Sequence, residues 1–181
     1  MKELSLNILD ITENSVKAGG TLTEIYVDEG GETLTLTIKD DGCGMDEETV
    51  KSVTDPFYTT RKTRKVGLGI PLLKLACEQT GGSLSITSSV DADDHGTTVT
   101  ATFFKNHIDF TPLGDVISSI VTLIQGHPDT DFLFRHATER GSVELDTREI
   151  RAVLEDVPLD TYEVILWIRE SLGEQYNELS I

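Results

Sequence analysis

The sequence predicts an α+β fold, α/β in the broad sense, in which an antiparallel-rich sheet carries its helices on one face. Two observations lead to this prediction. Over residues 1–105, elements with helical and strand-like periodicity follow one another in the order α-β-β-α-loop-α-β-β. This order contains no β-α-β alternation, which argues against a Rossmann fold, and the sequence has no P-loop motif.

The predicted elements of this first region differ in their hydrophobic period, about 3.6 residues for helices and about 2 for strands. In chain order they are a helix over 3–18, strands over 23–29 and 33–40, a short helix over 47–53, a loop over 54–66, a helix over 68–80, and strands over 83–89 and 97–104. Leu4, Ile8 and Ile11 form the apolar face of the first helix. Asp46 is a suitable N-cap for the short helix.

Residues 106–181 form a second region, a small α+β extension that we expect to be a partner-interaction or transducer-like element. Its predicted elements are a helix over 112–124, two strands around a turn near Gly141, a helix after Asp146 and a final helix over 161–178. The inward face of the final helix is expected to consist of Val164, Ile165, Ile168 and Leu172. A domain boundary is therefore expected near residue 105.

The chain of 181 residues is strongly acidic, with 32 Asp and Glu against 15 Lys and Arg and a net charge of −17. This balance argues against nucleic-acid and membrane partners, whose phosphates attract basic surfaces. No apolar run approaches the ~20 residues of a membrane span, and the N-terminus does not resemble a signal peptide. We therefore expect a cytoplasmic protein. Cys43 and Cys77 show neither disulfide nor zinc-site spacing.

Asp10 and Asn14 are candidates for a phosphate site because they lie four residues apart on the first helix and so share a face. The Asn14 side-chain oxygen could hold a magnesium ion that bridges phosphates. Asp10, one turn earlier, could orient a water molecule for attack on the terminal phosphate. The alternative is that both residues belong to the solvent-facing side of the helix.

Asp40 ends an apolar strand and opens a glycine turn. A carboxylate at this place can accept a hydrogen bond from an exocyclic amine, the group by which adenine differs from guanine at that edge. Gly42 and Gly44 would let the backbone pass close to a base or a phosphate. The alternative is an ordinary strand-to-helix turn, and both interpretations can hold together.

A basic segment over 61–65 precedes Gly67-Leu68-Gly69, which opens a predicted helix. Cations beside the N-terminus of a helix form an anion site, because the backbone N–H groups there lack partners within the helix. A charge run is usually a solvated loop, but its position directly before the Gly-x-Gly sequence favours the anion site.

Taken together, residues 1–105 resemble the GHKL superfamily, which contains gyrase, the heat-shock chaperone of ninety kilodaltons, histidine kinases and the mismatch-repair protein MutL. Five segments carry this resemblance: NILDITENSVKAGG (7–20) for the N box, DDGCGM (40–45) for the first glycine box, DPFYTTRK (55–62) for the F-box and lid start, GLGI (67–70) for the second glycine box, and GTTV (96–99) for the last motif. The architecture also resembles that of small stand-alone ATP-binding proteins of this superfamily.

The resemblance implies a Bergerat-type two-layer sandwich, with a mixed sheet and helices on one face, that binds ATP and Mg²⁺ under a mobile lid over 54–66. It assigns Asp10 to catalysis, Asn14 to the metal and Asp40 to the adenine amino group. The nucleotide-contacting residues that it implies are Asn14, Lys17, Asp40, Gly42, Gly44, Met45, Phe57, Thr59, Thr60, Arg61, Gly67, Leu68, Gly69 and Thr98. Lys17 and Arg61 would neutralise phosphate charge.

The match combines features of two branches of the superfamily. Lys17 and the FYTTRK segment resemble histidine kinases, whereas the acid at position 10 resembles the hydrolysing branch, in which a Glu usually fills that place. Because Asp is one methylene shorter, a misplaced base would leave a slow ATPase. We expect slow ATP hydrolysis or phosphotransfer, coupled to lid closure and signalling to a partner protein.

Two alternatives remain open for the function. The first is a protein kinase that acts in trans, because we expect any phosphate acceptor to be another protein. The second is a switch module that binds ATP or ADP without hydrolysis. A homodimer is compatible with each of them.

Overall fold

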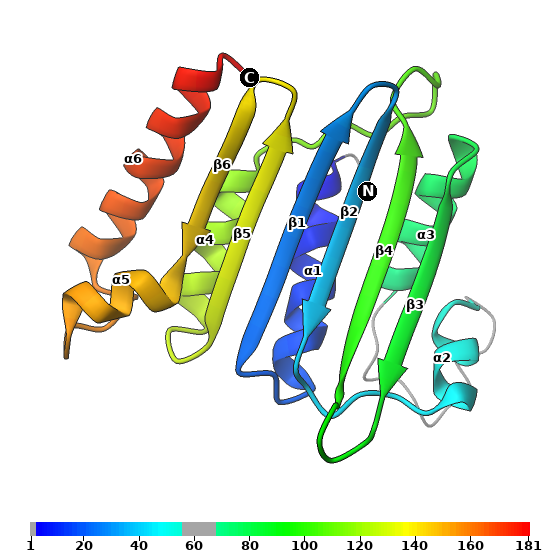
Figure 1. The fold of residues 1–181 in the computed structure, drawn as a ribbon, viewed down its shortest axis with the longest axis horizontal. Coiled ribbons are helices and arrows are strands. Elements are labelled where there is room, and N and C mark those ends of the chain that lie inside the picture. The colour runs from blue at the N-terminus through cyan, green and yellow to red at the C-terminus, as the bar shows by residue number, and fades with distance from the viewer. Residues whose placement is uncertain (1–2, 56–67) are drawn as a thin grey trace.

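The structure, a computed structural model, describes residues 3–55 and 68–181. Its centre is a six-stranded sheet with the strand order β3-β4-β2-β1-β5-β6 (Figure 1). In chain order the strands are β1 (Leu22–Gly30), β2 (Thr33–Asp40), β3 (Ser83–Ser89), β4 (Gly96–Phe104), β5 (Asp131–Thr138) and β6 (Gly141–Asp146). Neighbouring strands are antiparallel except β1 and β5, which run parallel. The sheet is therefore mixed and antiparallel-rich, as predicted.

Helices cover one face of this sheet (Figure 1), so the predicted α+β fold class is confirmed. In chain order they are α1 (Leu4–Lys17), α2 (Glu47–Val53), α3 (Gly69–Gln79), α4 (Val116–Gly126), α5 (Thr147–Leu154) and α6 (Tyr162–Leu179). Figure 1 shows α1, α3 and α4 behind the sheet, with α6 beside the edge strand β6. Leu4, Ile8 and Ile11 of α1 are at most 2% exposed, which is why this face of the helix is apolar.

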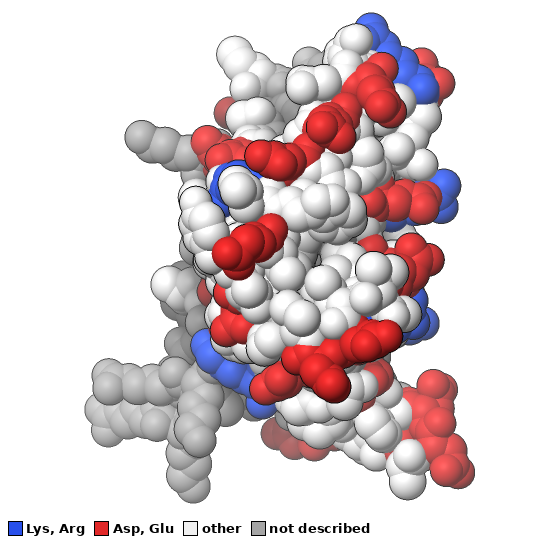
Figure 2. Space-filling view, turned by 90° about the vertical axis from the view of Figure 1, so that its left-hand side faces the viewer, with Lys and Arg blue, Asp and Glu red and all other residues white. Residues whose placement is uncertain are grey.

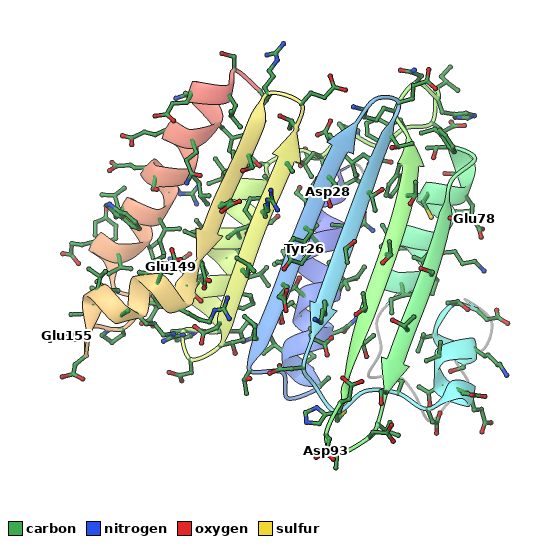
Figure 3. All side chains as sticks on the ribbon, viewed as in Figure 1. Tyr26, Asp28, Glu78, Asp93, Glu149 and Glu155 are labelled. Carbon is green, nitrogen blue, oxygen red and sulfur yellow. The ribbon has the colours of Figure 1, made fainter. Side chains whose placement is uncertain are left out.

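Strand alternation divides the sheet into a covered and an open face. On the covered face of β2, Leu34, Leu36 and Ile38 are buried in the core. The open face carries polar side chains, among them Tyr26 and Asp28 of β1, which are labelled in Figure 3. One hydrophobic core lies between the sheet and the helices, and it includes residues from both halves of the chain.

The predicted elements of the first region agree with the structure to within one residue at each end, where they are described. The predicted loop over 54–66 falls largely on 56–67, outside the described residues. None of the helices in the described parts of the chain is both long and apolar enough to span a bilayer.

The start of α4 differs from the prediction. A helix was expected from Pro112, but α4 begins at Val116, where the Asp115 carboxylate accepts a hydrogen bond from the Ser118 N–H at 3.0 Å. The carbonyl of Pro112 instead accepts a hydrogen bond from the Leu4 N–H at 2.9 Å. The segment before α4 thus supplies partners for the first N–H groups of α1, which have none within their own helix.

The final region continues the sheet of the first. β5 pairs with β1 over a register from Leu22–Asp131 to Asp28–Ala137, and β6 then forms the sheet edge. Val164, Ile165, Ile168 and Leu172 of α6 are buried, as expected from their spacing. The expected boundary near residue 105 stays a prediction.

Candidate functional site

A cleft of about 690 Å³ opens between α1, the turn after β2, α3 and the start of β4. Its described walls come from four parts of the chain: Ile11, Asn14, Ser15, Lys17 and Ala18 of α1 and its C-cap, Asp40 at the end of β2 with Cys43, Gly44 and Met45 of the following turn, Ile70 of α3, and Thr97 and Val99 of β4. A volume of this size is typical of sites for small organic ligands. Five residues expected to contact a nucleotide thus meet here: Asn14, Lys17, Asp40, Gly44 and Met45.

Asn14 enters the cleft with an unused bonding group. Its Nδ2 atom is buried and has no hydrogen-bond partner within the described residues. A buried polar group without a partner costs about 1–3 kcal/mol. Because the oxygen and nitrogen of an amide are assigned from their partners, either atom can face the cleft. The side chain is therefore suited to an additional partner that the described residues do not provide.

Asp40 lies at the end of β2 and is only 9% exposed. Its Oδ1 atom accepts a hydrogen bond from the Gly42 N–H at 2.9 Å. This bond fixes the carboxylate in the turn, and among the described residues no hydrogen bond uses its second oxygen. The second oxygen can therefore accept a hydrogen bond from a ligand in the cleft.

The two neighbouring acids have structural roles. The Asp41 carboxylate accepts hydrogen bonds from the Thr21 N–H at 2.7 Å and the Leu22 N–H at 3.0 Å, so it ties the turn to the start of β1. Burial raises the pKa of Asp41, but the hydrogen bonds from Leu22 and Thr21 outweigh it and hold the pKa below its usual value. Asp46 caps α2 as expected, accepting from the Thr49 N–H at 2.8 Å.

The glycines of this turn are required by protein packing. A Cβ on Gly42 would lie 2.9 Å from the Ala18 Cβ. Gly44 has a φ of +72°, and a Cβ there would overlap the carbonyl oxygen of Ser89. Gly44 lines the cleft, whereas Gly42 lines a smaller neighbouring pocket. Close approach of the backbone is therefore explained by the fold itself, before any ligand is considered.

Asp10 lies beside the N-terminus of α3. A Cβ on Gly69, the first residue of that helix, would overlap the Asp10 carboxylate. No side chain within the described residues caps α3, and a carboxylate at this place is stabilised by the helix dipole. Asp10 does not line the described walls of the cleft. Leu68, at the N-cap of α3, is exposed and also outside these walls.

Thr98, an expected nucleotide contact, does not line the cleft, whereas the neighbouring Thr97 does. Thr97 and Val99 line the cleft from the covered face of β4, so strand alternation puts Thr98 on the open face. Val99, Ala101 and Phe103 are all buried, which shows the phase of the alternation. This signal was present in the sequence and could have identified Thr97.

Five further expected contacts, Phe57, Thr59, Thr60, Arg61 and Gly67, lie outside the described residues. In the parts of the chain that are described, Lys17 is the one basic residue that lines the cleft. Sequence reasoning also missed Ile11, Ser15, Ala18, Cys43 and Ile70, which are small or apolar wall residues. Such residues carry no chemical signature by which they could be found.

A largely apolar cleft with a few polar side chains, placed between the helix layer and the end of a mixed sheet, is typical of small-ligand sites in α+β sandwich domains. The family model of the histidine kinase-, DNA gyrase B- and HSP90-like ATPases matches residues 2–107. The chain belongs to this family, and the resemblance to the GHKL superfamily is thereby confirmed.

Curated relatives include sensor proteins and kinases. The heme sensor protein HssS of Staphylococcus saprophyticus is 32% identical over 99 residues, which are 53% of this chain and 21% of the relative. Sporulation kinase C of Bacillus subtilis is 31% identical over 88 residues, which are 49% of this chain and 20% of the kinase. The chain thus spans about a fifth of the length of these relatives.

Solved structures share the fold at low identity. The Aquifex aeolicus MutL ATPase domain complexed with ADP has a TM-score of 0.53 and 14% identity, covering 86% of this chain and 70% of that domain. The N-terminal domain of a DNA repair protein has a TM-score of 0.58 and 16% identity, covering 81% of this chain and 52% of that one. Residues 1–107 alone cannot supply such coverage, so the shared fold includes part of the C-terminal region.

Proposed function

We propose that this protein binds Mg-ATP in the cleft and hydrolyses it slowly or transfers its terminal phosphate. One observation carries the proposal: Asn14 and Asp40 line one cleft, and each has a polar atom that the described protein leaves without a partner. Membership of an ATPase family and the fold shared with an ADP-bound domain support the choice of nucleotide.

Asp40 and Lys17 each suit one part of the nucleotide. The second oxygen of Asp40 accepts a hydrogen bond from the adenine amino group, which guanine lacks at that edge. The Lys17 ammonium neutralises phosphate charge, because it lines the same cleft from the end of α1.

Magnesium fits the residues that are present. The described residues contain no cluster of three or more His, Cys, Asp or Glu side chains suited to a metal ion. A magnesium ion needs no such cluster, since it keeps water and phosphate oxygens as ligands and takes few from the protein. The side-chain oxygen of Asn14, which lines the cleft, would be its protein ligand. When bound, the ion supplies charge neutralisation between phosphate groups.

Asp10 is the proposed catalytic base. Its carboxylate lies next to the N-terminus of α3 and beyond the described cleft walls. A base in this position would orient the water that attacks the terminal phosphate, and we propose that turnover is slow and coupled to lid closure over 54–66. The outcome of turnover would pass to a protein partner through residues 106–181.

ATP binding tests the cleft. Asp40→Asn keeps the acceptor for the Gly42 N–H but presents an NH₂ donor to the adenine amine, so ATP affinity should fall about tenfold or more, as expected for the loss of a hydrogen bond to a charged group. The measurement is calorimetric titration with Mg-ATP, with Asp93→Asn in an exposed turn as the matched control. Unchanged affinity in Asp40→Asn would remove the cleft assignment.

Turnover separates the functional alternatives. Purified protein is incubated with labelled Mg-ATP, and free phosphate is followed for the unmodified protein and Asp10→Asn. Phosphate release that is lost in Asp10→Asn, with ATP binding retained, supports the ATPase. Undiminished release in this variant removes Asp10 from catalysis. Binding without release in the unmodified protein favours the non-hydrolysing switch or a kinase that requires its acceptor.

A further inference from the structure

A second groove lies far from the cleft in the chain, between α5, α6 and the edge strand β6, with a volume of about 670 Å³. Its floor is apolar and consists of Leu145, Ile150, Val153, Leu154, Val164 and Trp167. Figure 2 shows this side of the molecule, where uncharged surface lies between groups of acidic residues. The groove belongs to the C-terminal region, which contributes no described residue to the walls of the cleft.

Two large apolar side chains of this groove are exposed to solvent. Trp167 of α6 is 54% exposed and Val153 of α5 is 83% exposed. Exposed apolar side chains gathered in one hollow mark an interaction site, and tryptophan is enriched among residues that dominate interface energy. Trp167 is also the single tryptophan of the chain, so its fluorescence reports on this groove alone.

The rim of the groove is anionic. Glu144, Asp146, Glu149 and Glu163 line it, and no Lys or Arg is among its described wall residues. Two of these carboxylates are paired, Glu144 with Arg135 at 3.0 Å and Asp146 with Arg148 at 2.7 Å. Within the described residues, Glu149 and Glu163 have neither an ion pair nor a side-chain hydrogen bond. The groove therefore presents apolar surface together with uncompensated negative charge.

The sheet edge beside the groove is blocked against an added strand. The Gln175 side chain of α6 accepts a hydrogen bond from the Glu144 N–H at 2.9 Å and donates one to the Glu144 carbonyl at 3.0 Å. Both backbone groups of this edge residue are thus already used. A partner segment would enter the groove through its side chains, as an amphipathic helix does, rather than by strand addition.

The charge selects the class of occupant. A second copy of this chain would bring another net charge of −17 to an already anionic rim. Nucleic acids and anionic lipids are repelled for the same reason. Complementarity instead requires a segment that places apolar side chains on the groove floor and Lys or Arg beside Glu149 and Glu163.

We propose that the groove between α5, α6 and β6 is the docking site for a basic amphipathic helix of a partner protein. The inference rests on the part of the proposed function that gives residues 106–181 a protein partner. It does not require ATP, so docking is measured without nucleotide, and ATP binding is measured separately on the same samples.

The probe is a synthetic helical peptide of about 18 residues, made of Leu and Lys with the leucines on one face. Added to the full-length protein, it should shift Trp167 emission to the blue and give a saturable titration, because the indole leaves water. Two control peptides are a Leu–Glu version with the same pattern and a Leu–Lys version with a scrambled pattern. Neither should produce the shift.

Charge reversal locates the binding. The double variant Glu149→Lys and Glu163→Lys should weaken peptide binding about tenfold or more, because two attractions become repulsions. Asp93→Lys changes charge in the turn between β3 and β4, and Figure 3 shows it well away from Glu149. This control should bind the peptide within about twofold of the unmodified protein. Circular dichroism checks that each variant is folded.

Three results would overturn the proposal. They are peptide binding that leaves Trp167 emission unchanged, an equal loss of affinity in Asp93→Lys, and equal binding of the Leu–Glu peptide. Trp167→Phe, followed with a labelled peptide, checks that affinity depends on this side chain. If the unmodified protein binds the peptide but not Mg-ATP, only the proposed nucleotide function is contradicted. If it binds Mg-ATP but not the peptide, only the docking site is contradicted.

Discussion

Asn14 and Asp40 line the cleft, and each keeps bonding capacity that the described residues do not use. Asp41, one residue further along, has its carboxylate committed to the start of β1. Two adjacent aspartates thus differ in role: the Asp41 carboxylate stabilises the turn, and the Asp40 carboxylate can still bind a ligand. Hydrogen-bond partners, rather than residue identity, make this distinction.

Also at the residue scale, one buried histidine side chain links the two regions of the chain. His136 of β5 is 3% exposed, and its ring contacts Glu29 of β1 and the Tyr176 hydroxyl of α6, each at 2.9 Å. The hydrogen bond from His136 lowers the pKa of Glu29 below its usual value near 4.5, although burial opposes this, and the charges of His136 and Lys105 add to the effect.

This pKa shift predicts a dependence of stability on pH. Because the pKa of Glu29 is lower in the folded state, its contribution is present above pH ~4.5 and is lost as the pH falls through the folded value. Glu29→Gln should therefore lose less stability between pH ~5 and pH ~3 than the unmodified protein does. Urea unfolding across this range measures the slopes, and parallel curves for the two proteins would contradict the prediction.

At the scale of single elements, two glycines differ in whether the local backbone conformation and packing require glycine. Gly173 lies inside α6, with nothing within 4 Å of an added Cβ. Gly44 lies in the turn after β2, where φ is +72° and a Cβ would overlap Ser89. The same substitution should therefore have opposite effects at the two positions.

Gly173→Ala should raise the free energy of unfolding by about 0.5–1 kcal/mol, because alanine restricts the unfolded chain and favours the helix. Gly44→Ala should lower it by about 1–3 kcal/mol or more, because a left-handed conformation and a steric overlap are both imposed. Thermal unfolding followed by circular dichroism measures both changes. A decrease in Gly173→Ala would show that α6 packs more tightly at this point than the structure indicates.

At the scale of the whole molecule, the two regions share one sheet and one hydrophobic core. β5 pairs with β1, and α4 packs beside α1 on the covered face (Figure 1). Removing residues 106–181 would expose the edge of β1 and the apolar surface of α1. We therefore propose that the boundary near residue 105 separates regions that unfold together.

Calorimetry tests this proposal. The full chain should show a single unfolding transition with equal calorimetric and van't Hoff enthalpies. A chain of residues 1–105 should have a lower midpoint or aggregate, because it exposes a strand edge and core side chains. Two separate transitions in the full chain, with 1–105 as stable as the first of them, would contradict the proposal.

Local patterns predicted most helices and strands correctly, because hydrophobic periodicity and turn-forming residues depend only on neighbours a few positions away in the chain. The paired glycines around β1 and β2 and the Asp46 cap of α2 are examples. The predicted start of α4 was wrong. Pro112 fits a helical pattern locally, but its carbonyl accepts a hydrogen bond from the Leu4 N–H of α1, more than a hundred residues earlier. Thr98 was the predicted nucleotide contact, but Thr97 and Val99 are the β4 residues that line the cleft, as the alternation through Val99 indicates.

The sequence by itself determined the family and the order of elements, and it indicated Asn14 and Asp40 as candidate ligand contacts, since these depend on motifs and short-range periodicity. Only the tertiary structure decided that β5 lies parallel to β1, that Thr97 faces the cleft and Asp10 lies beside α3, and that Trp167 lies in an acid-rimmed groove. These features depend on contacts between residues far apart in the chain, and local periodicity contains no information about which distant element a side chain will meet.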